Sequence, residues 1–202
     1  VTLGVGFLRV ELKEESTDDE VINTIKKLNE DDSVQGIILQ LPLPKHLNEK
    51  KIIREISVKK DIDCLTFESQ GKLYMGEPGF LPCTQNSVVT LIKSLNIDLN
   101  GKNVVVLGRS NIVGKPVAQL LLNENATVTI CHSRTKDLKE VCKRADILVV
   151  AIGRPKFIDE SYVNENAVVI DVGTSRFEGK ITGDVDFDKV IDKCSALTPV
   201  PG

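Results

Sequence analysis

The chain has 202 residues, of which 41% are hydrophobic, and this is enough to fill one large core or two small ones. The net charge of −3, with Lys and Arg scattered among Asp and Glu, argues against a nucleic-acid or anionic-membrane partner. No apolar run approaches the ~20 residues that span a bilayer and no signal-peptide pattern opens the chain, so we expect a soluble, cytoplasmic protein.

The first predicted elements are an extended run over residues 6–12 and a helix over residues 18–29. Thr17 and Glu20 have the spacing of a capping box, and apolar residues then recur on one helical face. The acidic residues of the first turn suit the helix dipole. We therefore interpret them as a solvated helix start rather than as a binding surface.

A buried strand is predicted over residues 36–40, and it ends in the polar side chain of Gln40. Ligands commonly lie at the carboxyl ends of strands in an α/β sheet, so Gln40 is either a site residue or simply the strand terminus. Two prolines then fix an extended loop over residues 41–46, and Asn48 is placed to cap a helix over residues 49–56.

Asp61 and Asp63 are two positions apart, which on an extended segment points both carboxylates to the same face. Such a pair fits acid–base chemistry, a metal site, or one ligand-binding acid beside a structural one. Because no third acid or histidine stands at metal-ligand spacing, we expect no metal.

The loop over residues 76–84 combines turn-forming residues with two bulky apolar ones, as expected for a wall or lid over a site. Thr84 is placed to cap a helix that continues to Leu95, and we interpret this helix as the link between two domains. The predicted domains are residues 1–95 and residues 96–202.

Residues 104–116 have the pattern of a strand, a tight turn and the start of a helix. Gly108 ends an apolar β-branched run, and Gly114 opens an amphipathic one. Glycines let a backbone approach a pyrophosphate, and the N–H groups of a new helix favour its charge. The general dinucleotide pattern would have glycines in place of Ser110 and Val113, so this motif alone is a weak signal.

The next predicted strand, residues 127–131, ends without the acidic residue that binds the ribose of NAD. Ser133 and Arg134 follow it, and together with Arg109 they offer a hydroxyl and cations suited to a 2′-phosphate. This pattern favours NADP as the cofactor. The alternative is a solvated basic turn that Ser133 or Thr135 caps.

The rest of the chain continues the alternation of helices and strands. We predict a helix over residues 138–145 and strands over residues 147–151, 167–172 and 196–200. Small or turn-forming residues follow these strands, as a cofactor lying along the carboxyl edge of a parallel sheet requires.

Cysteine and histidine usage argues against several kinds of site. The five cysteines are an odd number without C-x-x-C spacing, so we expect reduced thiols rather than a disulfide framework or a zinc site. His46 and His132 have no Ser or Cys nucleophile at a recognisable motif spacing, so a catalytic triad is not expected.

Nine segments, in order along nearly the whole chain, together resemble the bifunctional methylenetetrahydrofolate dehydrogenase/methenyltetrahydrofolate cyclohydrolase family. They are QLPLP (40–44), KDID (60–63), GEPGFLPCT (76–84), GRSNIVGKP (108–116), NATVT (125–129), CHSRT (131–135), IDVG (170–173), GDV (183–185) and TPVPG (198–202). The turn after Gly108, a poor general pattern, is similar to this family's own version of it.

The resemblance implies a homodimer in which two α/β domains flank a cleft, the C-terminal one being a Rossmann-like parallel sheet that binds NADP. It also implies a reaction in two steps. Hydride passes from methylenetetrahydrofolate to the nicotinamide, and water then opens the methenyl product to 10-formyltetrahydrofolate. The implied partners are therefore tetrahydrofolate substrates, with neither nucleic acid nor a membrane.

The resemblance gives individual residues a role by position. Gln40 resembles the glutamine that hydrogen-bonds the catalytic lysine, and Asp63 resembles the aspartate that holds the pterin ring. Thr174 stands where the family contacts the nicotinamide end of the cofactor. The residues that resemble the cofactor-phosphate contacts are Gly108, Arg109, Ser110, Ser133 and Arg134.

The chain also departs from the family pattern. The family's catalytic lysine lies in a Tyr-x-x-x-Lys motif, which does not occur in the 202 residues, and the family continues beyond the segment that ends in Gly202. Either the sequence omits residues or the protein is an inactive relative. We favour omission, because losing a first strand and helix would expose apolar surface. Cys64 replaces a usual glycine, and Gln85 a usual proline.

Two further functions remain open from the sequence. One is a Rossmann dehydrogenase for another small substrate, which activity in the absence of folate would support. The other is a non-catalytic protein that binds NADP or folate, which saturable binding without formation of the methenyl product would support.

Overall fold

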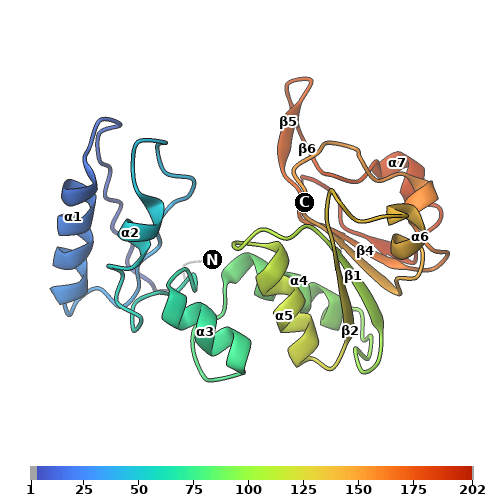
Figure 1. Cartoon of the computed structure of the whole chain (residues 1–202), viewed down its shortest axis with the longest axis horizontal. Coiled ribbons are helices and arrows are strands. Elements are labelled where there is room, and N and C mark those ends of the chain that lie inside the picture. Colours follow the sequence, from blue (N-terminus) through green and yellow to red (C-terminus); the bar gives the residue numbers. More distant parts are fainter. Residues whose placement is uncertain (1–3, 202) are drawn as a thin grey trace. The chain divides into compact units, whose positions relative to one another are not determined.

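The computed structural model describes residues 4–201, and the chain divides into two compact units, residues 1–69 and 70–202. Figure 1 shows the first unit in blue to blue-green and the second in green to red. In the described part of the chain, no helix is both long and apolar enough to cross a membrane.

The first unit is built on two helices, α1 (Asp18–Glu30) and α2 (Glu49–Ile53). The predicted capping box starts α1: the Glu20 carboxylate accepts the Thr17 backbone N–H at 2.8 Å, and the Thr17 hydroxyl accepts the Glu20 N–H at 3.3 Å. A small aliphatic core lies beneath these helices. It consists of Val21, Ile22, Ile25, Ile37, Ile52 and Ile56.

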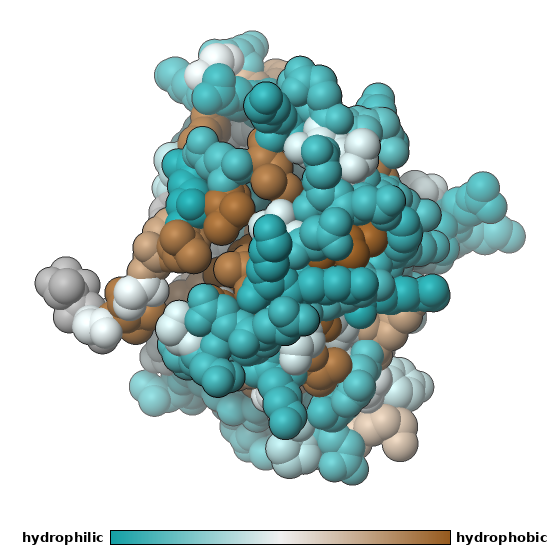
Figure 2. Space-filling model, turned by 90° about the vertical axis from the view of Figure 1, so that its left-hand side faces the viewer, coloured by the Kyte–Doolittle hydropathy of each residue, from teal (hydrophilic) through white to brown (hydrophobic). Residues whose placement is uncertain are grey.

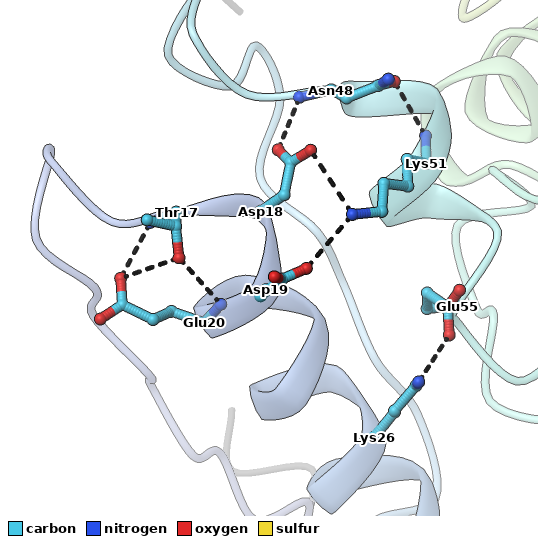
Figure 3. Close-up of polar contacts among 8 residues, drawn as sticks. All are labelled: Thr17, Asp18, Asp19, Glu20, Lys26, Asn48, Lys51 and Glu55. Atoms are coloured by element: carbon cyan, nitrogen blue, oxygen red, sulfur yellow. Dashed lines mark hydrogen bonds and ion pairs between the residues drawn. The ribbon is translucent and has the colours of Figure 1, made fainter.

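Polar contacts join the beginnings of α1 and α2 (Figure 3). The Asp18 carboxylate accepts the Asn48 backbone N–H at 2.8 Å, and the Asn48 side chain caps α2 by accepting the Lys51 N–H at 3.1 Å. The Lys51 ammonium lies 3.2 Å from Asp19 and 3.9 Å from Asp18. These ion pairs are exposed, so the aliphatic core rather than the charges holds the helices together.

The prediction of a buried strand over residues 36–40 is wrong. Ile37 is buried and forms an isolated bridge with Asp61, whereas Ile38 is 59% exposed and Gln40 is also exposed. A strand buried on both faces needs hydrogen-bonded neighbours, and among residues 4–69 this single bridge is the only pairing recorded. The segment therefore forms no sheet, and it contributes the buried Ile37 to the core, with the partly buried Leu39 packed against it.

The run over residues 6–12, predicted as extended, lies outside the helices and strands of the described residues. Its large apolar side chains are among the most exposed of the described residues, with Phe7 at 87%. Figure 2 shows apolar residues, in brown, between polar residues, in teal, on the face in view.

Two helices lie on either side of the predicted lid, over residues 76–84. Helix α3 (Phe67–Met75) was not predicted, because it is short and its turns are largely polar. Helix α4 (Cys83–Ser94) follows its N-cap residue Pro82, whose ring fixes φ at −64°, and no side chain caps the helix by a hydrogen bond. The prediction that Thr84 caps this helix is therefore wrong, since Thr84 lies inside its first turn.

The second unit contains a five-stranded, fully parallel sheet in the order β2-β1-β3-β4-β7 (Figure 1). Its strands are β1 (Asn103–Leu107), β2 (Thr127–Cys131), β3 (Ile147–Val150), β4 (Val168–Asp171) and β7 (Ala196–Leu197). All lie within the ranges predicted from the sequence or extend them by one residue. The α/β fold with a Rossmann-like parallel sheet is thus confirmed.

Helices cover this sheet and a hairpin extends from it. The remaining elements are α5 (Gly114–Asn123), α6 (Leu138–Cys142), α7 (Phe187–Val190), the 3-10 helix η1 (Glu160–Tyr162), and the hairpin strands β5 (Ser175–Phe177) and β6 (Lys180–Thr182). Val105 and Leu107 of β1 belong to one core cluster with Cys142 of α6 and Val190 of α7. Because successive strand residues face opposite sides and both sides are covered, the buried part of β1 after Asn103 and the whole of β3 are apolar.

Candidate functional site

The two central strands define the point where a ligand would lie on this sheet. From β1 the chain continues to β2 on one side, whereas β3 and the later strands lie on the other side. In open parallel sheets, such a reversal leaves a crevice at the carboxyl ends of the two strands, and cofactors bind there. The segments that follow β1 and β3 are therefore the candidate cofactor site.

Gly108 and Ala151 meet at this point. Gly108 follows β1 with a φ of +134°, and a Cβ added to it would lie 2.3 Å from the Ala151 carbonyl oxygen. A Cβ added to Gly114 would lie 2.2 Å from the Gly108 carbonyl oxygen, because the turn folds back on itself. Only glycine fits at either position, so this turn presents bare backbone to a ligand.

Ser110 organises the start of α5. Its hydroxyl oxygen accepts the backbone N–H groups of Val113 at 3.0 Å and of Gly114 at 3.2 Å. The hydroxyl hydrogen of Ser110 can still be donated to an anion, and the side chain is exposed. A serine here therefore supplies a side-chain donor where the general dinucleotide pattern has a glycine.

Gln85 is a further candidate site residue, which the sequence analysis names only as the replacement of a usual proline. Its side chain is 3% exposed on α4, and its amide donates to the Ile112 carbonyl in the middle of the glycine turn. The sequence offered one signal, a polar residue on the buried face of an amphipathic helix. The partner lies 27 residues further along the chain, so only the fold reveals it.

The turn after β2 holds the predicted 2′-phosphate residues. The Arg134 backbone N–H donates to His132 Nδ1 at 3.1 Å, and the His132 backbone N–H donates to the Thr135 hydroxyl at 2.9 Å. Thr135 thus closes the turn, while the Ser133 and Arg134 side chains are exposed at the end of the strand. The Gly108 N–H donates to the Cys131 carbonyl at 2.9 Å, which joins this turn to the glycine turn.

Two buried aspartates shape the segments after β3 and β4. Asp184 is fully buried, and its carboxylate accepts the N–H groups of residues 152–154 at 2.6, 2.9 and 2.6 Å. Asp171 accepts the N–H groups of Gly173, Asp184 and Val185 at 3.0, 3.1 and 2.9 Å. Burial raises the pKa of Asp171, and these N–H groups oppose the rise. Thr174 follows, with an exposed side chain.

In the first unit, the two aspartates of the KDID motif have different environments. Asp61 is fully buried and accepts the N–H groups of Leu65 at 2.9 Å and Thr66 at 2.8 Å. The chain turns directly after it, so the prediction that Asp61 and Asp63 share one face of an extended segment is wrong. Asp63 is half-buried. The structure thus makes Asp61 a structural acid.

Cys64 adjoins these aspartates in a left-handed conformation, with a φ of +55°. Glycine adopts this conformation without strain, which explains why a glycine would be usual at this position. The side chain is fully buried. Burial, together with the charges of Asp61 and Asp63, raises the pKa of the Cys64 thiol to about 12.

Gln40 is exposed at the end of its segment, and its amide donates to the neighbouring Leu41 carbonyl at 3.1 Å. Its side-chain oxygen is an acceptor suited to a cationic donor. Across residues 4–201, no group of three or more His, Cys, Asp or Glu side chains is placed to hold a metal ion.

Comparisons with protein families match both parts of the chain. The model described as tetrahydrofolate dehydrogenase/cyclohydrolase, catalytic domain, matches residues 1–63. The model described as tetrahydrofolate dehydrogenase/cyclohydrolase, NAD(P)-binding domain, matches residues 82–202. Bifunctional protein FolD of Clostridium botulinum is 83% identical over 201 residues, which are 100% of this chain and 71% of that protein.

Solved structures give the same result. The bifunctional FolD methylenetetrahydrofolate dehydrogenase/cyclohydrolase of Campylobacter jejuni is 47% identical with a TM-score of 0.91, over 94% of this chain and 68% of that one. The Trypanosoma brucei methylenetetrahydrofolate dehydrogenase-cyclohydrolase, complexed with NADP cofactor and inhibitor, is 37% identical with a TM-score of 0.90. That match covers 96% of this chain and 69% of the other.

Proposed function

The chain belongs to the tetrahydrofolate dehydrogenase/cyclohydrolase family, and we propose how its residues divide the work between cofactor and substrate. The function is that of a bifunctional, NADP-dependent enzyme of one-carbon folate metabolism. Methylenetetrahydrofolate is oxidised to methenyltetrahydrofolate, which is then hydrolysed to 10-formyltetrahydrofolate.

The observation that best supports a cofactor site is the close approach of Gly108 to Ala151. Bare backbone at the switch point, followed by a ten-residue helix, suits a pyrophosphate. We assign Gly108, Arg109 and Ser110 to this group. Such a cradle fits NADP, which when bound accepts a hydride, and the chain's own task is to hold and orient it.

The remaining cofactor contacts follow from chemistry at the strand ends. Ser133 and Arg134 are assigned to the 2′-phosphate, because a guanidinium pairs with phosphate oxygens and a hydroxyl donates to them. Thr174, exposed after β4, is assigned to the nicotinamide end. Hydride transfer then depends mainly on positioning two bound partners.

The substrate half rests on Asp63 and Gln40. A half-buried carboxylate accepts hydrogen bonds from the N–H groups of a pterin ring, and Asp63 is assigned this role. The side-chain oxygen of Gln40 is assigned to orient the family's catalytic lysine, a donor that the 202 residues do not contain. Ring opening requires proton transfer, so it should depend on this lysine more than hydride transfer does.

We also propose domain boundaries, an assembly and a location. The folate-binding domain comprises residues 1–95, and the NADP-binding domain comprises residues 96–202. The protein is a homodimer in the cytoplasm, and the exposed side chains of the edge strand β2 support a further contact at this edge. Sedimentation velocity should give twice the subunit mass, and a monomer at micromolar concentration would contradict the assembly.

The substrate half is tested with Gln40→Ala in the full-length protein. We expect cyclohydrolase turnover to fall about tenfold or more, because the lysine loses its acceptor, while NADP affinity stays within about twofold. The matched control is Gln35→Ala, since Gln35 is an exposed glutamine whose amide donates to the nearby Asp32 carbonyl at 3.2 Å. Normal cyclohydrolase turnover in Gln40→Ala would refute the role of Gln40.

A further inference from the structure

The segment after β3 resembles an anion site that the protein itself has filled. Three consecutive N–H groups, of Ile152, Gly153 and Arg154, converge on the Asp184 carboxylate. Gly153 has a φ of +65°, and successive N–H groups around such a residue form a concave nest for anions. Because the Asp184 carboxylate occupies this nest, its donors are not offered to a phosphate.

The same contacts fix where the carbonyl oxygens of the segment point. The peptide bonds between residues 151 and 154 are trans, so each carbonyl points opposite to the N–H of its own peptide plane. The carbonyls of Ala151, Ile152 and Gly153 are therefore directed away from Asp184. The Ala151 carbonyl has this orientation, since its oxygen faces Gly108 at the switch point.

Asp184 is itself held in place from two sides. Asp171 accepts the Asp184 backbone N–H at 3.1 Å and the Val185 N–H at 2.9 Å. Gly173 packs so closely that an added Cβ would lie 2.1 Å from the Asp184 carboxyl carbon. The carboxylate is thus fixed by backbone on both sides, and it cannot follow a ligand.

We propose that Asp184 is a positioning residue that makes the end of β3 a hydrogen-bond acceptor surface for the nicotinamide nucleoside of NADP. The inference rests on the proposed cofactor site at this edge. Carbonyl oxygens accept from the ribose hydroxyls and the carboxamide NH₂ of the nicotinamide nucleoside, and the nearby negative charge disfavours phosphate. The phosphates are left to the turn between Gly108 and Gly114, where residues 109–112 supply backbone N–H groups beside the Ser110 hydroxyl, while Gly108, Val113 and Gly114 donate within the protein. At this edge of the sheet, carbonyl acceptors after β3 thus bind the nicotinamide nucleoside, and N–H donors after β1 bind the phosphates.

The test compares two ligands by isothermal titration calorimetry on the full-length protein. NADP carries the nicotinamide nucleoside, and adenosine 2′,5′-bisphosphate lacks it. Asp184→Asn turns an NH₂ group toward at least one of the three N–H donors, so the nest opens. We expect the Kd for NADP to rise about tenfold and that for the bisphosphate to change by less than about twofold.

The control is Asp159→Asn, because Asp159 also accepts a backbone N–H, that of Ser161 at 2.8 Å, but at the start of η1. We expect no change for either ligand. If Asp184→Asn does not fold, Asp171→Asn is measured, and a smaller loss confined to NADP is expected. Equal weakening of both ligands, or of neither, overturns the inference. If the unsubstituted protein binds neither ligand, the proposed cofactor site itself fails.

Discussion

The cores of the two units of this protein are built differently. In the second unit, the strands β1, β3 and β4 bury near-continuous runs of β-branched residues, and the candidate cofactor site lies where the backbone leaves the strand ends. In the first unit, two helices cover a small aliphatic core, and the candidate substrate residues Gln40 and Asp63 lie on irregular segments. Substitutions should therefore act through backbone fit in the second unit and through side-chain chemistry in the first.

The largest expected effect tests backbone fit. Gly108→Ala would place a Cβ 2.3 Å from the Ala151 carbonyl oxygen, at a φ that side chains rarely adopt. The resulting shift costs about 3 kcal/mol, and we expect NADP binding to weaken roughly 100-fold, measured by calorimetry.

The control for this experiment is Gly71→Ala. Gly71 lies inside α3, and an added Cβ there would meet no atom within 4 Å. Alanine favours a helix more than glycine does, so stability should rise by up to about 1 kcal/mol with NADP affinity unchanged. If Gly108→Ala also bound NADP normally, the glycine turn would not be the phosphate cradle.

A second pair of substitutions tests side-chain chemistry within one motif. Asp61→Asn leaves at least one buried N–H, of Leu65 or Thr66, facing an NH₂ group, which costs about 1–3 kcal/mol of unfolding free energy. Asp63→Asn should leave the melting temperature nearly unchanged but raise KM for the folate substrate about tenfold. Thermal melts and steady-state kinetics separate the two effects. A stability loss in Asp63→Asn, equal to that in Asp61→Asn, would make both acids structural.

A smaller effect tests whether the first unit is packed as tightly as the second. Cys64 in the first unit and Cys142 in the second are both fully buried, and burial raises the pKa of each thiol to about 12. At pH 8, such a thiol is ionised in only about one molecule in 10,000, and the thiolate is the reactive form. Both should therefore react with Ellman's reagent only on unfolding.

The exposed Cys83 supplies the contrast. We expect one fast-reacting thiol in the native protein and none in Cys83→Ser, because the other four thiols are at least partly buried. Fast reaction of Cys64 in that variant would mean that the first unit opens more readily than its burial indicates.

The same contrast explains what the sequence could predict. Strand β2 was predicted at its observed bounds, and α5 begins at Gly114 as expected, because short runs of β-branched residues and glycine turns are local signals. The apolar run over residues 36–40 looks like those strands. Its outcome depends on whether a neighbouring strand pairs with it, and a single run does not contain that information.

The candidate site residues likewise fall into two groups, those that the sequence predicts and those that only the fold reveals. Which residues stand at strand ends was readable, as for Ser133 and Arg134. By contrast, the contact of Gln85 with Ile112 and the nest around Asp184 join positions far apart in the sequence, which the chain brings together only on folding. The acidic pattern at Asp61 and Asp63 was visible, but burial decided which of the two is structural.

The most direct test of the account compares NADP with NAD in the full-length enzyme. The ratio of kcat/KM for the two cofactors, with methylenetetrahydrofolate, is measured before and after replacing Ser133 and Arg134 by alanine. We predict that the unsubstituted enzyme prefers NADP, and that the double variant loses roughly 10- to 100-fold of this preference with NAD kinetics unchanged. A preference for NAD, or a double variant that keeps its preference for NADP, would contradict the cofactor site described for this edge of the sheet.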